Sequence, residues 1–313
     1  MTALKIAAVQ MCAELGATDR NLSAAGSFVR DAFREGAQWV ILPEFFTSAM
    51  AFAPSMAQAW LPLEGKALAM MRSLARQFDG VVGGSYVARE GNDCVNAFLL
   101  VFPDGSYYRH DKDIPTMWEN CYYIGGVDDG VLETPIGAVG VALCWEFIRT
   151  QTARRLKDRV QLVVGGTCWW DFPMPVPERY LRLTRHISRN FERDAPARLA
   201  SMLGVPVVHA SHAGDFTAVT PGNETKNYRS NYLGETQIVD ANGNVLKRMT
   251  VADGEGYVIA DVQLGAISTG RTSIPDTFWT CKLTPGAQQA WDEQNAFGCG
   301  YYENVTRKHL IGR

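Results

Sequence analysis

The chain has 313 residues, of which 47% are hydrophobic and 20% are charged, and its formal net charge at pH 7 is −3. This composition is typical of a globular protein with enough chain for a substantial core, and it disfavours nucleic acid or an anionic membrane as a partner. No apolar run approaches the roughly 18 residues that a membrane-spanning helix needs. The N-terminus runs straight into a strand-like segment without the pattern of a signal peptide, so we expect a cytoplasmic protein.

Strand-length apolar runs alternate with helix-like stretches in the first part of the chain. We predict strands at 5–10, 39–42, 80–86, 96–102 and 107–110. Helices are predicted at 21–35, where apolar residues recur at helical spacing before Gly36, and at 66–78. The Pro-Asp-Gly segment at 103–105 has the turn chemistry of a hairpin.

The alternation continues in the second part of the chain. We predict helices at 149–157, 178–191 and 194–203, and strands at 139–143, 161–164, 204–209, 232–240, 245–250 and 256–261. A loop rich in proline and aromatic residues occupies 168–177. The final segment, 269–313, has little periodicity and could either cross to a partner subunit or fold back on its own chain.

This order of elements predicts the fold class. Helices and strands alternate without an internal repeat or a break in composition, which favours one α/β domain over 1–313, with a core at about 4–264 and a tail at about 269–313. Hairpins and crossovers occur together, which favours a mixed sheet. The seven cysteines are odd in number and have no C-x-x-C spacing. Neither a disulfide framework nor a zinc cluster is therefore expected.

Cys144 lies where the buried strand predicted just before it gives way to a helix. A tight strand-to-helix junction can present a thiol to a cleft with backbone N–H groups beside it, which is the geometry of a covalent catalyst. The alternative is a free cysteine buried in the core, which is common. A Cys–His dyad is also open to this chain, with candidate partners His110, His186, His209 and His212.

Two charged residues at the ends of other predicted strands favour the catalytic interpretation of Cys144. Glu44 follows the strand at 39–42, and Lys112 follows the strand at 107–110. Strand ends meet at one edge of an α/β sheet and form active sites there. A thiol with its ordinary pKa of about 8.5 needs a base or a cation beside it. Taken singly, Glu44 could cap a turn and Lys112 could be a solvated charge.

Three motifs, in this order along the chain, resemble those of the nitrilase, or carbon–nitrogen hydrolase, superfamily. They are the segment 42–44 (Leu-Pro-Glu), the segment 112–119 with Lys112 and a second glutamate, Glu119, and the segment 140–146 around Cys144. The resemblance to this family runs from Lys5 to about Val262. The segment 172–194 is longer and more charged than is usual in that family.

The resemblance implies a fold and a chemistry. The family has a four-layer α-β-β-α sandwich with two mixed sheets and is usually dimeric, so we expect a homodimer or a larger homo-oligomer. It implies hydrolysis of a non-peptide carbon–nitrogen bond in a small-molecule amide, carbamoyl or nitrile substrate. Neither a cofactor nor a metal is implied, and neither nucleic acid nor a membrane is an expected partner.

The resemblance also implies roles for the residues in the motifs. Glu44 would deprotonate Cys144, whose sulfur would attack the substrate carbon. Lys112 and the backbone N–H of Trp145 would hold the oxyanion, and Glu119 would position Lys112 or the hydrolytic water. Candidate substrate-binding residues are Phe45, Trp169, Trp170 and His212. Glu146 is expected to be structural, because its charge is favourable at the start of a helix.

The motifs leave the substrate open. The set of glutamate, lysine and cysteine serves amides and nitriles alike, and we expect an amidase or carbamoylase ahead of a nitrilase. A protein of another class, a catalytically silent binding protein on the same fold, has no reason to keep Glu44, Lys112 and Cys144 together. A domain that transfers acyl groups or glutamine-derived ammonia is a third interpretation.

Overall fold

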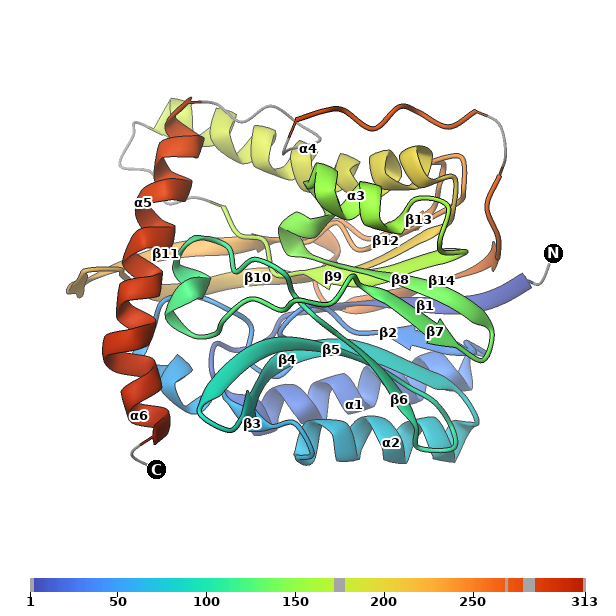
Figure 1. The fold of residues 1–313 in the computed structure, drawn as a ribbon, viewed down its shortest axis with the longest axis horizontal. Coiled ribbons are helices and arrows are strands. Elements are labelled where there is room, and N and C mark those ends of the chain that lie inside the picture. Colours follow the sequence, from blue (N-terminus) through green and yellow to red (C-terminus); the bar gives the residue numbers. More distant parts are fainter. Residues whose placement is uncertain (1–2, 172–177, 268–269, 278–284, 312–313) are drawn as a thin grey trace.

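The computed structural model describes residues 3–171, 178–267, 270–277 and 285–311 and has a large mixed sheet with helices on both sides (Figure 1). Helices α1 and α2 lie on one side of the strands, and α3 and α4 lie on the other. The helices are α1 (Thr18–Arg34), α2 (Lys66–Phe78), α3 (Thr150–Leu156), α4 (Glu178–Leu203), α5 (Pro285–Tyr301) and α6 (Arg307–Ile311).

The hydrogen-bonded strands follow the order β6-β5-β4-β2-β1-β10-β9-β8-β7, with β3, β11, β12, β13 and β14 attached to this path. Their bounds are β1 (Ala3–Met11), β2 (Trp39–Ile41), β3 (Leu61–Pro62), β4 (Val81–Glu90), β5 (Asp93–Val101), β6 (Tyr107–Asp111), β7 (Val131–Thr134), β8 (Gly137–Leu143), β9 (Leu162–Thr167), β10 (Val207–Thr220), β11 (Asn223–Leu233), β12 (Gln237–Val239), β13 (Val245–Arg248) and β14 (Gly256–Gln263). These strands confirm the predicted α/β class. The expected division into two separate sheets is not confirmed.

The six neighbouring strands from β4 to β8 along this path are all parallel. Strand β6 points the same way as β4, because each is antiparallel to β5. The carboxyl ends of β2, β6, β8 and β9 therefore lie at the same edge of the sheet, where α/β folds place their ligands. Strands β8 and β9 approach closely, since a Cβ added at Gly165 would lie 1.8 Å from the backbone oxygen of Ala142.

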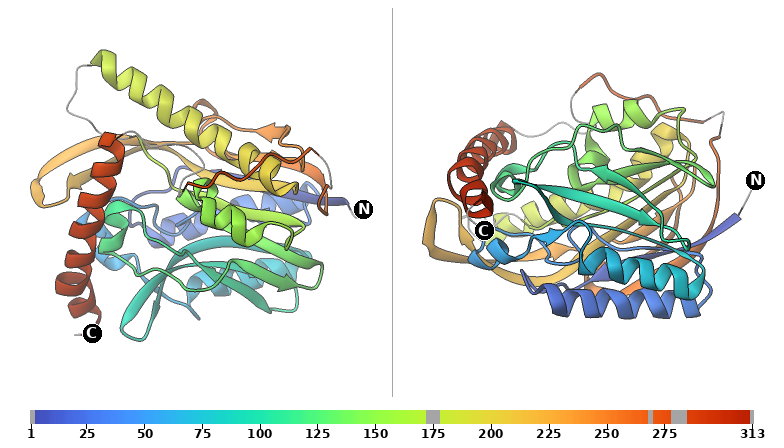
Figure 2. Two further views of the ribbon diagram at one scale, coloured as in Figure 1. Left: turned by 45° about the horizontal axis from the view of Figure 1, so that its top comes forward. Right: turned by 60° about the horizontal axis from the view of Figure 1, so that its bottom comes forward.

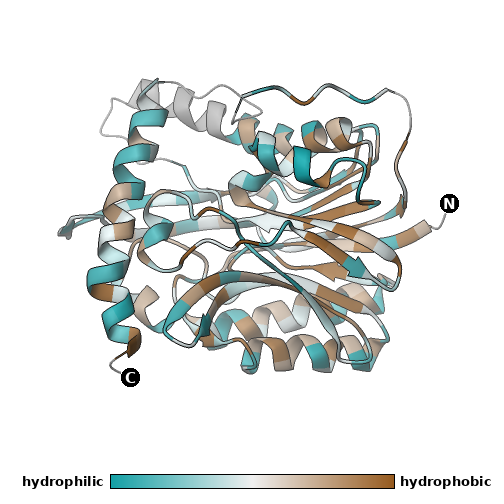
Figure 3. Ribbon diagram, in the orientation of Figure 1, coloured by the Kyte–Doolittle hydropathy of each residue, from teal (hydrophilic) through white to brown (hydrophobic). Residues whose placement is uncertain are grey.

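Two buried apolar clusters form the core. One packs the helices against the strands, with members such as Val29, Leu68 and Leu199. The other joins side chains from strands in both halves of the sheet, such as Ile41, Phe98, Leu143 and Val164. Figure 3 shows apolar residues concentrated along the strands, while the helices carry polar and apolar residues in turn. No helix among the described residues is both long and apolar enough to span a lipid bilayer.

Several predicted boundaries change in the structure. Helix α1 starts three residues before the predicted position, at Thr18. The two helices predicted at 178–191 and 194–203 are one continuous helix, α4, which contains Pro196. A proline usually interrupts a helix because it lacks an N–H group, but the buried face of α4 continues through Ala195 and Leu199. The loop at 172–177 lies outside the described residues.

The sequence analysis missed a long hairpin and two helices. Strands β10 and β11 extend well beyond the predicted strands and pair from Ala213 with Leu233 to Thr220 with Asn223. The segment at the end of the chain, predicted as a poorly periodic tail, forms α5 and α6. These helices fold back on the same chain along the edge at which the parallel strands end, as the two further views also show (Figure 2).

Candidate active site

Three segments that meet at this edge each carry a residue with a left-handed backbone. Phe45 follows Glu44 and has a φ of 53°, Met117 lies just before Glu119 with a φ of 54°, and Cys144 has a φ of 52°. Residues other than glycine rarely adopt this backbone conformation, and those that do are concentrated at functional sites. The backbone therefore turns sharply at each of the three segments that the sequence analysis singled out.

Glu44 is completely buried and its carboxylate has fixed partners on both oxygens. Its Oε1 accepts hydrogen bonds from Nδ2 of Asn96 at 2.9 Å and from Nζ of Lys112 at 3.0 Å. Its Oε2 accepts a hydrogen bond from the backbone N–H of Cys168 at 3.0 Å. These contacts come from β5, from the end of β6 and from the end of β9, so the sheet edge itself fixes the orientation of the carboxylate.

Lys112 lies between two carboxylates. Its Nζ is 3.0 Å from Oε1 of Glu44 and 2.6 Å from Oε2 of Glu119, and all three side chains are fully buried. The rings of Phe45 and Tyr123 are 5.9 Å and 6.0 Å from the same nitrogen. The ammonium group is therefore held by charge on two sides and by aromatic rings on others.

Glu119 is placed by a short 3-10 helix, η2 (Met117–Cys121). Its Oε2 accepts hydrogen bonds from the backbone N–H of Thr116 at 3.0 Å, from Lys112 and from the hydroxyl of Tyr123. Its Oε1 is buried and has no hydrogen-bond partner among the described residues. A buried carboxylate oxygen without a partner is costly, which suits an atom that binds substrate or water.

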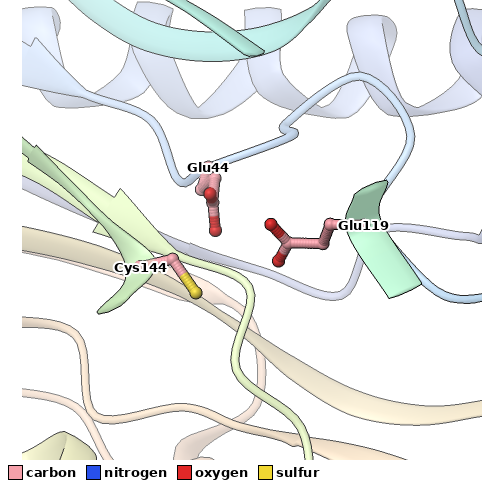
Figure 4. Close-up of side chains that lie close together, drawn as sticks. All are labelled: Glu44, Glu119 and Cys144. Atoms are coloured by element: carbon pink, nitrogen blue, oxygen red, sulfur yellow. The ribbon is translucent and has the colours of Figure 1, made fainter. Parts of the chain in front are cut away.

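Cys144 begins a second 3-10 helix, η3 (Cys144–Ile148), directly after β8. Its Sγ and one carboxylate oxygen each from Glu44 and Glu119 lie within 4.8 Å of one another. Figure 4 shows the three side chains pointing toward a common centre. The junction is held by Glu146, whose buried carboxylate accepts hydrogen bonds from the backbone N–H groups of Leu143 at 2.8 Å and Asp113 at 3.0 Å. The strand that carries the thiol is thereby tied to the segment that carries Lys112.

Burial decides the protonation states of the acid and the thiol. Burial raises the pKa of Glu44 to about 7, although Lys112 lowers it. Burial also raises the pKa of the Cys144 thiol well above its ordinary value, and the negative charge of Glu44 adds to this effect. The thiol is therefore neutral at neutral pH, while Glu44 is close to half ionised.

Lys112 stays charged in this site. Burial alone would lower the pKa of its amine, but the neighbouring acidic groups, Cys144 when it is ionised and the carboxylates Glu119 and Glu44, outweigh burial and raise it well above the ordinary value. A permanent cation thus lies beside a neutral nucleophile and a titrating base. Glu44, Glu119 and Cys144 could by their spacing hold a metal ion. The ammonium of Lys112 already places a positive charge among them, which does not favour a second cation there.

The predicted substrate-binding residues are all buried. Phe45 packs against Tyr123 with ring centroids 5.8 Å apart. Trp170 stacks on Trp118 of η2 at 4.3 Å, and Trp169 lies 6.0 Å from the ring of Phe191.

His212 contacts the backbone of the Glu44 segment, and Trp145 belongs to the nucleophile segment itself. Nε2 of His212 lies 2.7 Å from the backbone oxygen of Glu44, so this ring supports the backbone at Glu44. Burial lowers the pKa of His212 to about 4, which keeps the ring neutral. The ring of Trp145 packs against Trp291 of α5 at 4.8 Å.

The sequence analysis did not single out Asn96, Tyr123 and Thr116, although all three contact the central carboxylates. Thr116 had a detectable signal, because Thr-x-x-Glu before a short helix is the pattern of a capping box. No sequence pattern marked Asn96 or Tyr123, since a polar residue in a strand and a tyrosine after a turn are common in proteins without a functional role. His110, a candidate for a dyad with Cys144, instead bonds Asp128 and Glu146.

Comparison with known proteins identifies the family to which the chain is similar. The family model described as carbon-nitrogen hydrolase matches residues 5–272. A nitrilase from Pyrococcus abyssi is 27% identical over 160 residues, which are 49% of this chain and only 60% of that protein. An N-carbamoylputrescine amidase from Oryza sativa is 24% identical over 284 residues, which are 86% of this chain and 88% of that protein.

A solved structure supports the fold. The carbon–nitrogen hydrolase superfamily protein XC1258 from Xanthomonas campestris, which has an arsenic adduct in its active site, superposes with a TM-score of 0.65. It is 18% identical and the match covers 84% of this chain and 91% of that protein. At this identity the likeness concerns the fold alone.

Proposed function

This chain belongs to the carbon–nitrogen hydrolase family, and on that premise we propose that it hydrolyses a small amide or carbamoyl compound to an acid and ammonia through a thioester. The observation that carries the proposal is the buried cluster in which Lys112 bridges Glu44 and Glu119 beside Sγ of Cys144. The cluster provides a nucleophile, a base and a fixed positive charge in a site shielded from water.

The first half of the reaction follows from the protonation states. Because the Cys144 thiol is neutral, Glu44 takes its proton as the sulfur attacks the amide carbon. Negative charge develops on the substrate oxygen, which Lys112 and the backbone N–H of Trp145 stabilise. Glu44 then gives the proton to the leaving nitrogen, the carbon–nitrogen bond breaks, ammonia departs, and the acyl group remains on the sulfur as a thioester.

The second half regenerates the thiol. Glu44 takes a proton from water as the water oxygen attacks the thioester carbon, and it returns that proton to the departing sulfur. The free Oε1 of Glu119 is placed to accept a hydrogen bond from the substrate nitrogen or from this water. A nitrile would add the same thiol across its carbon–nitrogen triple bond and form a thioimidate first.

We further infer that the sheet folds into two layers between the helices, the four-layer sandwich of the family. The support is the second apolar cluster, in which Ile41 and Phe98 from one half of the strand order share a core with Leu143 and Val164 from the other half. We also infer a homodimer or larger homo-oligomer by likeness to the family, which sedimentation or light scattering would test.

Ammonia release from a panel of purified small amides, carbamoyl compounds and nitriles tests the proposed reaction. We expect release from amides or carbamoyl compounds, and hydroxamate formation when hydroxylamine replaces water as the acceptor of the thioester. Release from nitriles alone would identify a nitrilase. Release from no compound, with Cys144 unreactive toward alkylation, would contradict the proposal and favour a binding protein.

The pH dependence of kcat/KM reports on Glu44. We expect activity to be low in acid and to rise with an apparent pKa of about 7, because only ionised Glu44 can accept the thiol proton. The variant Asn96→Ala removes a hydrogen bond to the ionised carboxylate and should move this limb to higher pH. A profile that is flat between about pH 5.5 and pH 8.5 would show that Glu44 is not the titrating base.

A further inference from the structure

Helix α5 lies across the edge where the catalytic strands end, although it falls outside the part of the chain that matches the family. The family match stops at residue 272, and α5 begins at Pro285. The helix runs along one end of the molecule, beside the segment that follows β6 and beside the hairpin of β10 and β11 (Figure 1). Its contacts therefore belong to this chain and cannot be taken over from the family.

The first contact is with the nucleophile segment. Trp291 of α5 stacks on Trp145, the residue after Cys144, with ring centroids 4.8 Å apart and an angle of 11° between the planes. The guanidinium carbon of Arg149, at the end of η3, lies 5.6 Å from the same ring. Both tryptophans are 7% exposed. A parallel stack of this kind between two buried rings is a specific and favourable contact.

The second contact is with η2, the segment that carries Glu119. Oδ1 of Asn295 accepts a hydrogen bond from Nδ2 of Asn120 at 2.9 Å. One turn further on, a Cβ added at Gly298 would lie 2.6 Å from Cβ of Asn120 and 3.1 Å from the backbone oxygen of Met117. The two helices thus approach so closely at this point that only glycine fits without a shift.

The third contact is with the loop that follows Glu44. Phe297 and Tyr301 both pack edge-on against Phe52, at 6.0 Å and 5.3 Å between ring centroids. Phe52 also lies 6.1 Å from Tyr122 of the lysine and glutamate segment. One face of α5 therefore contacts all three segments that supply the catalytic side chains.

We propose that α5 is a built-in cap of the active site and that Trp291 limits the size of the substrate acyl group. The proposal rests on the proposed function and deepens it: the substrate is a small amide or carbamoyl compound that the cap encloses completely. Glu44, Lys112, Glu119 and Cys144 are all 0% exposed. A helix packed over such a site excludes water from the thioester and fixes the pocket wall beside the residue that follows the nucleophile.

The test is a change in size preference when the indole is removed. Propionamide and 4-phenylbutyramide are compared as substrates for the wild-type protein and for Trp291→Ala, Trp291→Leu and Trp291→Phe. For Trp291→Ala we expect the ratio of kcat/KM for the bulky amide to that for the small amide to rise by about tenfold or more. Trp291→Phe should change this ratio least, and Trp291→Leu replaces the alanine variant if that fails to fold.

The matched control is Glu293→Ala, which changes an exposed residue of the same helix. This variant should keep the wild-type ratio. If the bulky-to-small ratio of kcat/KM is unchanged in the Trp291 variants, or changes equally in Glu293→Ala, Trp291 does not limit the size of the acyl group. Loss of activity toward both amides in equal measure would show that Trp291 only supports the nucleophile segment.

A second readout does not depend on amide turnover. Alkylation of Cys144 by iodoacetamide and by N-phenylmaleimide is followed by mass spectrometry of the peptide that contains it, because Cys12 and Cys299 are exposed and also react. We expect Trp291→Ala to raise the rate with the bulky maleimide by about tenfold relative to iodoacetamide. If no amide is a substrate, the proposed function fails while this ratio still decides whether α5 caps the thiol.

Discussion

Replacing Cys144 with alanine is expected to lower ammonia release by at least about 10⁴-fold, to the background of the assay. The thiol is the atom that bonds to the substrate carbon in the proposed reaction, and its Sγ lies at the common centre of the Glu44 and Glu119 carboxylates. The side chain is small and buried in a turn, so its removal leaves the surrounding hydrogen bonds of Glu44 and Lys112 intact.

The control for this variant is Cys94→Ala. Cys94 is equally buried, but it lies near the start of β5, against the hydroxyl of Tyr302. Its loss should cost about as much stability as that of Cys144 and leave turnover within about twofold of wild type. Retention of more than about a tenth of wild-type activity by Cys144→Ala, in a sample free of wild-type protein, would contradict the covalent mechanism.

The sequence predicted the positions of Glu44, Lys112 and Cys144 because strand geometry brings the ends of parallel strands together. Glu44 and Cys144 follow apolar runs, which can be recognised without any knowledge of the fold, and Lys112 follows a predicted strand that pairs across a recognisable hairpin turn. Glu119 could be predicted from its motif and also from the capping-box pattern that it forms with Thr116. The family model supports the recognition of the family itself.

The partners of these residues could not be predicted in the same way. Asn96 and the N–H of Cys168 reach Glu44 across large sequence separations, and no local pattern marks a hydrogen bond between distant strands. Glu146 was expected to stabilise a helix start by its charge. It is instead a buried acceptor between β8 and the Lys112 segment, with Arg155 and His110 as further partners.

The same limit explains the end of the chain. Helix α5 has a weak amphipathic pattern because the face that makes its contacts, Trp291, Asn295 and Gly298, has helical spacing but carries an asparagine and a glycine in place of apolar side chains. Glycine and asparagine inside a helix normally argue against a helix. Here tertiary packing against η2 and η3 supplies the stability that local propensity does not.

Replacing Lys112 with methionine is expected to reduce kcat by about 10³-fold and to change how the pH affects stability. The loss of activity follows from the loss of the cation that stabilises the oxyanion. The effect on stability follows because Glu44 and Glu119 then lie buried beside each other without the ammonium group between them. Methionine has a similar length, so the packing against Phe45 and Tyr123 is largely preserved.

The sign of the pH effect is set by Glu44. In the folded wild-type protein burial raises its pKa to about 7, above the ordinary value, so the protonated form favours folding and this contribution is lost as the pH rises through about 7. Lys112 lowers the pKa of Glu44, and its removal must therefore raise that pKa further. The free energy of unfolding of Lys112→Met should then fall more steeply than that of wild type between about pH 5 and pH 8.

Urea unfolding at a series of pH values measures this slope, with the exposed Lys247→Met on β13 as the matched control for loss of one positive charge. The control removes the same charge from the protein as a whole, so a steeper slope in Lys112→Met alone isolates the buried cluster. Equal slopes of the unfolding free energy against pH in the two variants would contradict the raised pKa of Glu44. They would also show that Lys112 is not the group that keeps Glu44 ionised enough to act as a base. Turnover and stability thus test one electrostatic arrangement by independent measurements.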